Sequence, residues 1–560
     1  MTPVPSLPSR VFVPRRLALG VVAMLLAGCA VSPPAALTPA DLLQQDRSDR
    51  QAMFAAQEPI GAPVTLDEAI ARAIKYNLQQ RVALMERALE DDLVDVQGQG
   101  MLPRLAARAG LRTRSNEYAS SSESVRTGTQ SLEPSTSQER AMQSADLQLS
   151  WNVLDFGLSY FGAKAQGNKA LAAEERRRRV VADIIRQTRS AYWNAVTAER
   201  LKERVAQTLA QTRQSLANAR QSGERRLVSP LAALRYQRDL LGMVRQLETL
   251  DADLALARSR LASLMNLAPG TAFALAPVGD DELAVPSLPY AREDLEALAM
   301  VRRAELREEG YLGRNAALET RMALLRLLPN ASLFGGLNYD SNKYLVHSNW
   351  ADAGVQVSWN LLGLLSWSAV EKSGRTREEL AGLRRQALRM SVLTQVNVAW
   401  LERERAEGLF RRASELSRLQ DAIRDQTENA ARSQAETQLE LVRARVETLL
   451  SARARDLAYA ELLNAQGTVY QAAGIDPLPD QVADLSVAGL ARTVADTRRL
   501  IERGHVEIPR LASAEVPAPV SAAEVASAAP AAQPALRQVR GTRWATLGSV
   551  AEGGVDAQAR

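Results

Sequence analysis

Few side chains in this sequence could carry out covalent chemistry. The 560 residues include two histidines, His347 and His505, and a single cysteine, Cys29. Metal sites need several such groups at a defined spacing, and a nucleophilic centre needs a base beside its nucleophile. The carboxylates of the predicted helices have basic residues three or four positions away, as solvated helix faces do. We therefore expect no enzymatic activity, no bound metal and no cofactor.

The cysteine lies in a setting that points to lipid attachment. A basic stretch is followed by a short apolar run at 17–26 and then by Leu-Ala-Gly-Cys29. This order is typical of a secretory signal peptide. The four residues resemble the bacterial lipoprotein box, which implies cleavage after residue 28 and acylation of Cys29, for example with palmitate. Ala30 in the next position favours sorting to the outer membrane. An ordinary signal peptide with an incidental cysteine is the alternative.

The composition indicates long helices and argues against a nucleic-acid-binding protein. Aromatic residues make up 4% of the chain, while Ala, Leu, Arg, Glu and Gln are abundant. The net charge is +5, but the basic residues are spread along the chain instead of gathering on one face. No run of about 18 apolar residues follows Cys29. Any membrane crossing by the mature chain should therefore use strands.

The sequence contains a tandem duplication. Trp151 and Trp359 lie 208 residues apart, within the similar stretches "LQLSWNVL" and "VQVSWNLL". Upstream, the Leu-Pro pairs at 102–103 and 328–329 lie 226 residues apart. The extra 18 residues must fall before Leu147, and the Ser- and Thr-rich segment 115–140 is the place for them. We expect this segment to form an exposed loop.

The duplication divides the chain into five parts. We expect a signal peptide, a lipid-anchored tether without clear pattern, two repeats and a partly disordered C-terminal tail with an Ala- and Pro-rich stretch at 512–536. The bounds are 1–28, 29–63, 64–288, 289–480 and 481–560.

Each repeat should consist of a helix, two strands, a long helix and a shorter helix. In repeat 1, Thr65 and Glu68 have the spacing of a capping box, and Pro103 should end one continuous helix that starts there. Period-two alternation predicts strands near 104–112, 146–153, 330–339 and 355–361. The remaining helices are expected at about 158–230, 230–269, 364–433 and 439–474. Two short helices match the length of one long helix, which favours a coiled-coil-like bundle.

The alternation gives the predicted sheet a polar and an apolar face. The polar positions are Arg104, Arg108, Arg112, Gln148, Ser150, Asn152, Gln356, Ser358 and Asn360. The apolar positions are Leu147, Leu149, Trp151, Val357 and Trp359. A closed membrane barrel needs at least about eight strands, and open edges are not tolerated in lipid. Several chains would therefore share one barrel, with the polar face lining a pore and the apolar face with its aromatic residues meeting lipid. Ordinary packing is the alternative for the aromatic residues.

Several motifs recur in a characteristic order. They are "VTLDEAIARAIKYN" (64–77), the two Leu-Pro helix ends, "SWNVLDFG" (150–157), "SGERRLVSPLAAL" (222–234), "LMNLAPG" (264–270) and "AAGIDP" (472–477). In this order the chain resembles the outer-membrane efflux protein (TolC-like) family over about residues 64–478. Together with Cys29, the resemblance is to its lipoprotein-type members, the outer-membrane factors of tripartite efflux systems.

The resemblance implies a mixed, mainly α fold. It would be a homotrimer with a long antiparallel helical barrel in the periplasm and a transmembrane β-barrel built from four strands per chain. Its function would be passive export across the outer membrane, with outer-membrane lipid, a periplasmic adaptor and an inner-membrane transporter as partners. The lipid anchor favours small-molecule efflux over type I protein secretion. A periplasmic lipoprotein scaffold without a pore is the alternative from a different class.

The resemblance also places a periplasmic tip at the far ends of the long helices. Candidate residues for adaptor docking or tip packing are Gly223, Ser229, Leu231, Leu234, Leu439 and Val442. The alternative is that they only hold the hairpins together. Glu440 and Arg443 are the candidate tip constriction, because they fall where some family members carry two carboxylates whose cation-binding rings close the pore. Arg443 reverses one of these charges, which puts the ring in doubt and makes a simple ion pair the alternative.

Overall fold

A computed structural model describes residues 35–55, 57–225, 229–279, 283–433, 435, 437–476, 478 and 482–508. The chain divides into two compact units, Met1–Ile508 and Pro509–Arg560. Cys29, the signal peptide and the stretch 512–536 lie outside the described residues, so what the sequence predicts for them stays a prediction.

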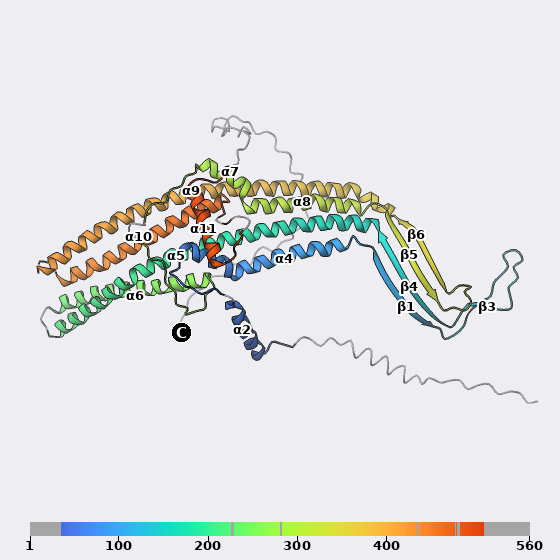
Figure 1. Ribbon diagram of the computed structural model, residues 1–560, viewed down its shortest axis with the longest axis horizontal. Helices are drawn as coiled ribbons and strands as arrows, with labels where there is room; N and C mark the ends of the chain where they lie inside the picture. Colours follow the sequence, from blue (N-terminus) through green and yellow to red (C-terminus); the bar gives the residue numbers. More distant parts are fainter. Residues whose placement is uncertain are drawn as a thin grey trace, which may run out of the picture. The chain divides into compact units, whose positions relative to one another are not determined.

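Two helices, a strand pair, a long helix and a shorter helix occur twice in the element order, with β2, β3 and η2 as additions (Figure 1). The elements up to the end of repeat 1 are α2 (Pro39–Phe54), α3 (Leu66–Tyr76), α4 (Leu78–Gln99), β1 (Arg104–Thr113), β2 (Tyr118–Ser120), β3 (Ser135–Gln138), β4 (Ala141–Asn152), α5 (Val153–Glu224) and α6 (Pro230–Leu264). Those that follow are α7 (Arg292–Arg302), α8 (Ala304–Leu325), β5 (Asn330–Asp340), β6 (Asn349–Ser358), the 3-10 helix η2 (Leu361–Ser366), α9 (Trp367–Arg432), α10 (Gln438–Ala472) and α11 (Val487–Glu502).

Four strands form one antiparallel sheet in the order β1-β4-β5-β6 (Figure 1). Each neighbouring pair is antiparallel and in unbroken register over nine or ten positions. The predicted loop 115–140 is largely exposed, but it also contains the short hairpin of β2 and β3.

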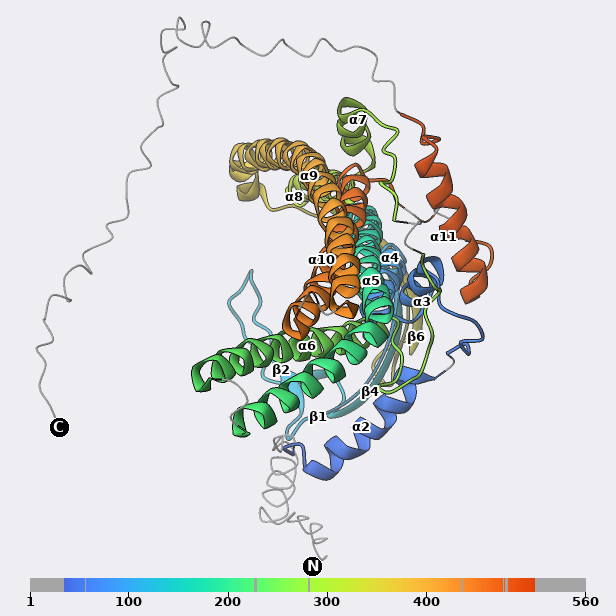
Figure 2. The same ribbon diagram turned by 90° about the vertical axis from the view of Figure 1, so that its left-hand side faces the viewer.

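The helices continue the order of the strands as one layer. Nearer the sheet, α4 packs on α5, α5 on α8, and α8 on α9; farther away, α6 packs on α5, α5 on α10, and α10 on α9. Figure 2 shows the pairs α5–α6 and α9–α10 side by side. As predicted, two short helices lie along one long helix: α4 with 22 residues and α6 with 35 both pack on α5, which has 72.

Local sequence explains where the long helices begin and end. The side chain of Asn152 accepts hydrogen bonds from the backbone N–H groups of Leu154 and Asp155, which caps the start of α5 at the last residue of β4. Ser229 caps α6, and Pro230 occupies its first position, where the missing N–H costs nothing. Strand and helix thus follow each other without a loop at the junction of β4 and α5.

The prediction of one continuous helix before each strand pair is wrong. Asn77 has an extended backbone (φ −61°, ψ 128°), which separates α3 from α4, and its side chain caps α4 through the N–H of Gln79. Arg303 has a similar conformation between α7 and α8. The predicted capping box is half formed: Thr65 accepts from the N–H of Glu68, while the Glu68 carboxylate pairs with Arg72 at 2.9 Å.

Two helices lie where the sequence suggested no element. α2 lies within the predicted tether and starts with a full capping box between Thr38 and Asp41. α11 lies after the second repeat and packs on α3 (Figure 2). The strand ends also differ from the prediction, since Val153 belongs to α5, while Trp359 and Asn360 follow β6.

Candidate functional site

The sheet register brings the predicted polar residues onto one face. Arg108 lies opposite Asp146, Ser150 opposite Arg104, and Ser332 opposite both Asn152 and Gln356. Residues that lie directly opposite each other point to the same side of a sheet. All predicted polar strand positions therefore share a face: Arg104, Arg108, Arg112, Gln148, Ser150, Asn152, Gln356 and Ser358. Asn360 is separate from them, because it caps η2 through the N–H of Gly363.

The other face of the sheet is apolar and exposed. Leu149 lies opposite Leu105, Trp151 opposite Leu333, and Ala331 opposite Val357. The exposed members of this face are Leu105, Leu111, Leu147, Leu149, Trp151, Leu333, Leu337, Tyr339, Val355 and Val357. An exposed apolar patch of this extent indicates contact with another protein or with lipid, because it would be unfavourable in water.

Trp151 and Trp359, the two aromatic residues predicted to meet lipid, make the same type of hydrogen bond. The indole Nε1–H of Trp151 donates to the carbonyl oxygen of Met101 at 3.1 Å, and that of Trp359 donates to the carbonyl oxygen of Leu327 at 3.0 Å. Each indole thus ties the end of a strand to the end of the preceding helix. The equivalence of the two bonds agrees with the duplication inferred from the sequence.

Acidic neighbours partly neutralise the arginines of the polar face. Arg108 lies 3.8 Å from Asp146, and Arg104 lies 3.9 Å from Asp155. The neutralising charges come from the neighbouring strand and the start of α5. Phe334 is on the same face and lies opposite Gly354, where an added Cβ would overlap its ring. The absence of a side chain at Gly354 therefore makes room for the phenyl group.

Both borders of the layer lack a partner within the described part of the chain. β1 and β6 are each paired on one side only. The border helices α4, α6 and α9 expose large apolar side chains, among them Val82, Met85, Leu89, Val96, Leu241, Leu256, Leu383, Met390, Leu401, Leu419 and Ile423. Unpaired strand edges together with exposed apolar stripes are features of a surface that another chain covers.

The predicted tip residues separate into two groups. Leu231 and Leu234 at the start of α6 are exposed, at 59% and 64% of their surface. Val442 is 2% exposed, and Leu439 packs with it against the core formed by α5, α6 and α10. Ser229 caps α6, and Gly223 lies in the last turn of α5 against the side chain of Gln237. Leu439 and Val442 therefore pack within the helical layer, while Leu231 and Leu234 are exposed on the single chain.

Glu440 and Arg443 form an ion pair on one face of α10. The distance from Arg443 Nη1 to Glu440 Oε1 is 2.6 Å, and both side chains are about two-fifths exposed. The alternative named from the sequence, a pair within one helix, is what the structure contains. A carboxylate that is already paired attracts added cations less strongly than a free one.

We predict that replacing Arg443 with aspartate creates a cation-binding site. Arg443→Asp would place two carboxylates on one face of α10, so a trivalent cation should bind at least about tenfold more tightly than to the unmodified protein. Arg443→Gln is the matched control, since it removes the guanidinium without adding a second carboxylate. The measurement is isothermal titration calorimetry of each purified protein with the cation. Equal affinity of the unmodified protein and the Asp variant would contradict the prediction.

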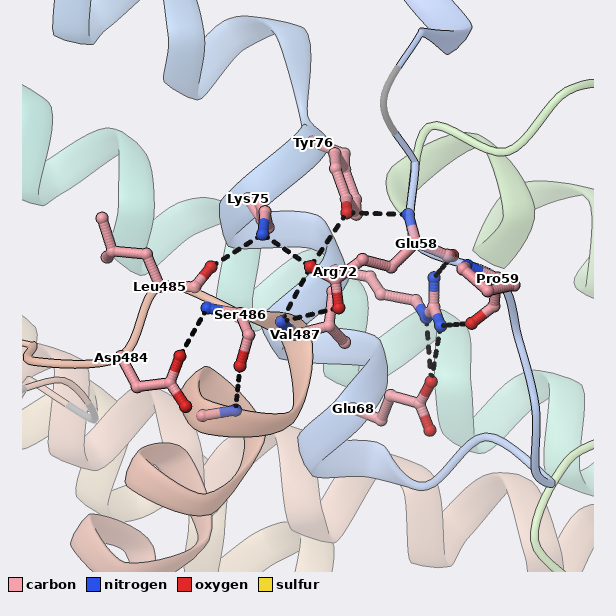
Figure 3. A network of polar contacts seen from close by, with 11 residues as sticks. Glu58, Pro59, Glu68, Arg72, Lys75, Tyr76, Asp484, Leu485, Ser486 and Val487 are labelled. Atoms are coloured by element: carbon pink, nitrogen blue, oxygen red, sulfur yellow. Dashed lines mark hydrogen bonds and ion pairs between the residues drawn. The ribbon is translucent and has the colours of Figure 1, made fainter.

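A polar network that the sequence did not reveal joins the N-terminal segment to α11 (Figure 3). The Glu58 carboxylate accepts hydrogen bonds from Lys75 Nζ at 2.6 Å and from the N–H of Val487, the first residue of α11, at 3.2 Å. Arg72 donates to the carbonyl oxygens of Glu58 and Pro59 at 2.8 and 3.1 Å. A negative charge at a helix N-terminus is favourable, so Glu58 helps to fix α11. The signal for α11 in the sequence was Ser486 followed by apolar residues at helical spacing.

We predict that Glu58→Gln loosens α11 at neutral pH. The hydrogen bond from Lys75 holds the pKa of Glu58 below its usual value of 4.5. The stabilisation by this carboxylate is therefore present above pH 4.5 and is lost as the pH falls through the lowered pKa. Proteolysis within α11 should be several-fold faster in the variant at pH 7, and the two proteins should converge in acid. Equal rates at pH 7 would contradict this role.

The described helices include none that combines the length and the apolar character of a membrane-spanning helix. Neither the family models nor the sequences of curated proteins gave a match to this chain.

Comparison with solved structures gives clear matches to outer-membrane proteins. The CmeC outer membrane channel of Campylobacter jejuni matches with a TM-score of 0.58 and 13% identity, over 83% of this chain and 99% of that one. The MtrE outer membrane channel of Neisseria gonorrhoeae matches at 0.56 and 17%, over 73% and 89%. The outer membrane protein VceC of Vibrio cholerae matches at 0.54 and 13%, over 73% and 96%.

These proteins are channels or outer-membrane proteins by name. The matches cover between 73% and 83% of this chain. The family resemblance inferred from the sequence is thus confirmed at the level of the fold, which is that of the TolC-like outer-membrane channels.

Proposed function

We propose that this protein is a passive channel-tunnel of the outer membrane, built from three copies of the chain. One observation carries the proposal: a single sheet has one polar face, one exposed apolar face and two unpaired edges. Lipid is the environment in which such an apolar face is stable, and lipid does not tolerate unpaired strand edges. Closing the sheet requires further copies.

Three copies satisfy both requirements. Twelve strands are within the range of membrane barrels, whereas the four strands of one chain are too few. In the closed barrel β1 of one copy would pair with β6 of the next, so the polar face would line the pore. The same rotation would bring the α4 and α6 border of one copy against the α9 border of its neighbour, which buries the apolar stripes of both.

The transport role follows from the two ends of this assembly. The pore would open to the exterior at the sheet, and the exposed Leu231 and Leu234 would dock a periplasmic adaptor at the other end. An inner-membrane transporter would supply energy, because a pore has no catalytic step of its own. We favour small-molecule efflux over type I protein secretion, since the predicted acylation at Cys29 is the feature of the lipoprotein-type factors.

A periplasmic scaffold of long helices without a pore is the second candidate. Such a scaffold would need only the borders of the helical layer as binding surfaces. It would not need an apolar sheet face on which Leu147, Leu149 and Trp151 remain exposed. This observation is the reason that we prefer the channel.

The test is conductance of the purified full-length protein in a planar lipid bilayer. We expect discrete, uniform current steps, with larger steps in variants whose tip is opened by replacing Glu440 and Arg443 with alanine. A protein that never gives discrete steps, even with an opened tip, would argue for the scaffold.

A further inference from the structure

A cavity of about 260 Å³ lies apart from the sheet and the tip, where α3 and α11 cover α5 and α10. Most of its wall is apolar, from residues of all four helices: Leu66, Ile70, Ile185, Leu463, Val494 and Ile501. Ligand sites in proteins combine such a wall with a few polar groups. The polar groups of this cavity are unusual, because three of them have atoms without a hydrogen-bond partner.

The first of these groups is the guanidinium of Arg189. It lines the cavity, its Nε is buried without a hydrogen bond, and no ion pair joins it to any carboxylate of the described residues. Burial and the neighbouring Arg186 lower the pKa of Arg189 to about 10, so the group is still a cation at neutral pH. Gly467 on α10 makes room for it, since an added Cβ there would overlap the guanidinium. Among the described residues, this guanidinium therefore lines the cavity without a carboxylate as counter-ion.

The other two groups are an N–H donor and a carbonyl acceptor. The indole Nε1–H of Trp193 and the amide Oε1 of Gln466 are both buried and unpaired. Gln466 is held in place because its Nε2 donates to the carbonyl oxygen of Ser287 at 2.8 Å and to the hydroxyl of Tyr470 at 3.1 Å. A buried polar atom without a partner costs about 1–3 kcal/mol and is rare in native proteins. Three of them around one cavity make it a candidate ligand site.

The remaining charged groups of the cavity are already paired. Arg498 donates hydrogen bonds to the carboxylates of Asp67 at 2.9 Å and of Glu502 at 3.2 Å. Neither group is available to neutralise Arg189. An incoming ligand would therefore meet one free positive charge, one free donor and one free acceptor within an apolar wall.

We propose that this cavity binds an apolar monocarboxylate that also carries one hydrogen-bond donor, one molecule per chain. The carboxylate accepts hydrogen bonds from Arg189 and Trp193, and the donor on the ligand's body reaches Gln466 Oε1. Because the ligand touches α5 and α10 as well as α3 and α11, its binding holds these four helices together. The proposal is independent of the export function.

Isothermal titration calorimetry with the full-length protein in detergent tests the site. Indole-3-propionate is the probe, since it has one carboxylate, one N–H and an aromatic body, and indole-3-propionamide is its neutral control. We expect the acid to bind at one molecule per chain and to raise the thermal midpoint. The amide should bind at least about tenfold more weakly, as a lost charge-assisted hydrogen bond predicts.

Three variants separate the site from non-specific binding. Arg189→Gln should weaken the acid about tenfold or more, and Gly467→Ala should do the same by displacing the guanidinium, while Arg189→Lys should keep part of the affinity. Equal affinity for acid and amide, no binding of the acid at millimolar concentration, or undiminished binding by a folded Arg189→Gln protein would each overturn the proposal. If Arg189→Gln does not fold, the comparison of acid and amide on the unmodified chain decides.

Discussion

Arginine at Leu147 and Leu149 should abolish stable assembly in the outer membrane, whereas arginine at the intervening Gln148 should be tolerated. The three residues are consecutive on β4, and the two leucines are on the exposed apolar face. An arginine that faces lipid at the membrane midplane costs about 2–4 kcal/mol. Two substitutions per chain in three chains add up to a penalty comparable to the whole stability of a domain.

The control uses the other face of the same strand. Gln148 lies opposite Ala106, which has only a methyl group, and Gly336, which has no side chain, so there is room for a longer residue. In the proposed pore this arginine would meet water. The measurement is the amount of each variant recovered as an oligomer from outer-membrane fractions. Loss of the Gln148→Arg protein together with normal recovery of the double leucine variant would reverse our assignment of the two faces.

Truncation of Leu247 to alanine should give the largest loss of stability in the helical part. Leu247 is fully buried at the centre of the cluster that joins α5, α6 and α10, together with Leu240, Leu250, Val446 and Leu449. Removing a buried leucine side chain costs about 2–5 kcal/mol, because a cavity remains where the structure relaxes incompletely. The distal hairpin of α5 and α6 should therefore open before the sheet end does.

Thermal unfolding followed by circular dichroism measures this effect. Gln246→Ala is the matched control, since residue 246 is the exposed neighbour of Leu247 on the same helix. Its midpoint should stay within the error of the unmodified protein, while that of Leu247→Ala should fall clearly. Similar midpoints for both variants would mean that the cluster contributes little to the stability of the helical layer.

Strands and helices could be predicted from the sequence where polar and apolar residues alternate regularly or where a long stretch lacks proline. Alternation predicted the sheet faces, and the proline-free stretch before Pro230 predicted a helix whose observed length is 72 residues. The two tryptophans gave the repeat offset, and they make equivalent hydrogen bonds in the structure. These signals are reliable because they depend on local geometry, which the neighbouring residues alone determine.

Features that depend on contacts between distant residues could not be read from the sequence. The breaks at Asn77 and Arg303 interrupt stretches with good helical periodicity, and Arg303 lacks a side-chain capping bond. The position of α11 depends on Glu58, 429 residues away. The different burial of Val442 and Leu234, which occupy similar places after their turns, arises from the packing of α10 against α5 and α6.

The pairing of Arg443 with Glu440 was visible in the sequence as one of two possibilities. A spacing of three residues allows an ion pair on one helix face and equally allows two side chains that point to a common axis. The distance of 2.6 Å between them favours the first. The unpaired Arg189 gave no such signal, since one arginine among the many in α5 is distinguished only by its surroundings.

The central claim is that one chain supplies only part of a wall that several copies complete. Native mass spectrometry of the full-length protein, extracted from outer membranes in mild detergent, counts these copies directly. Our account predicts a complex of three chains that stays intact when collisional activation removes the detergent. A water-soluble monomer, or a complex with any number of chains other than three, would contradict it.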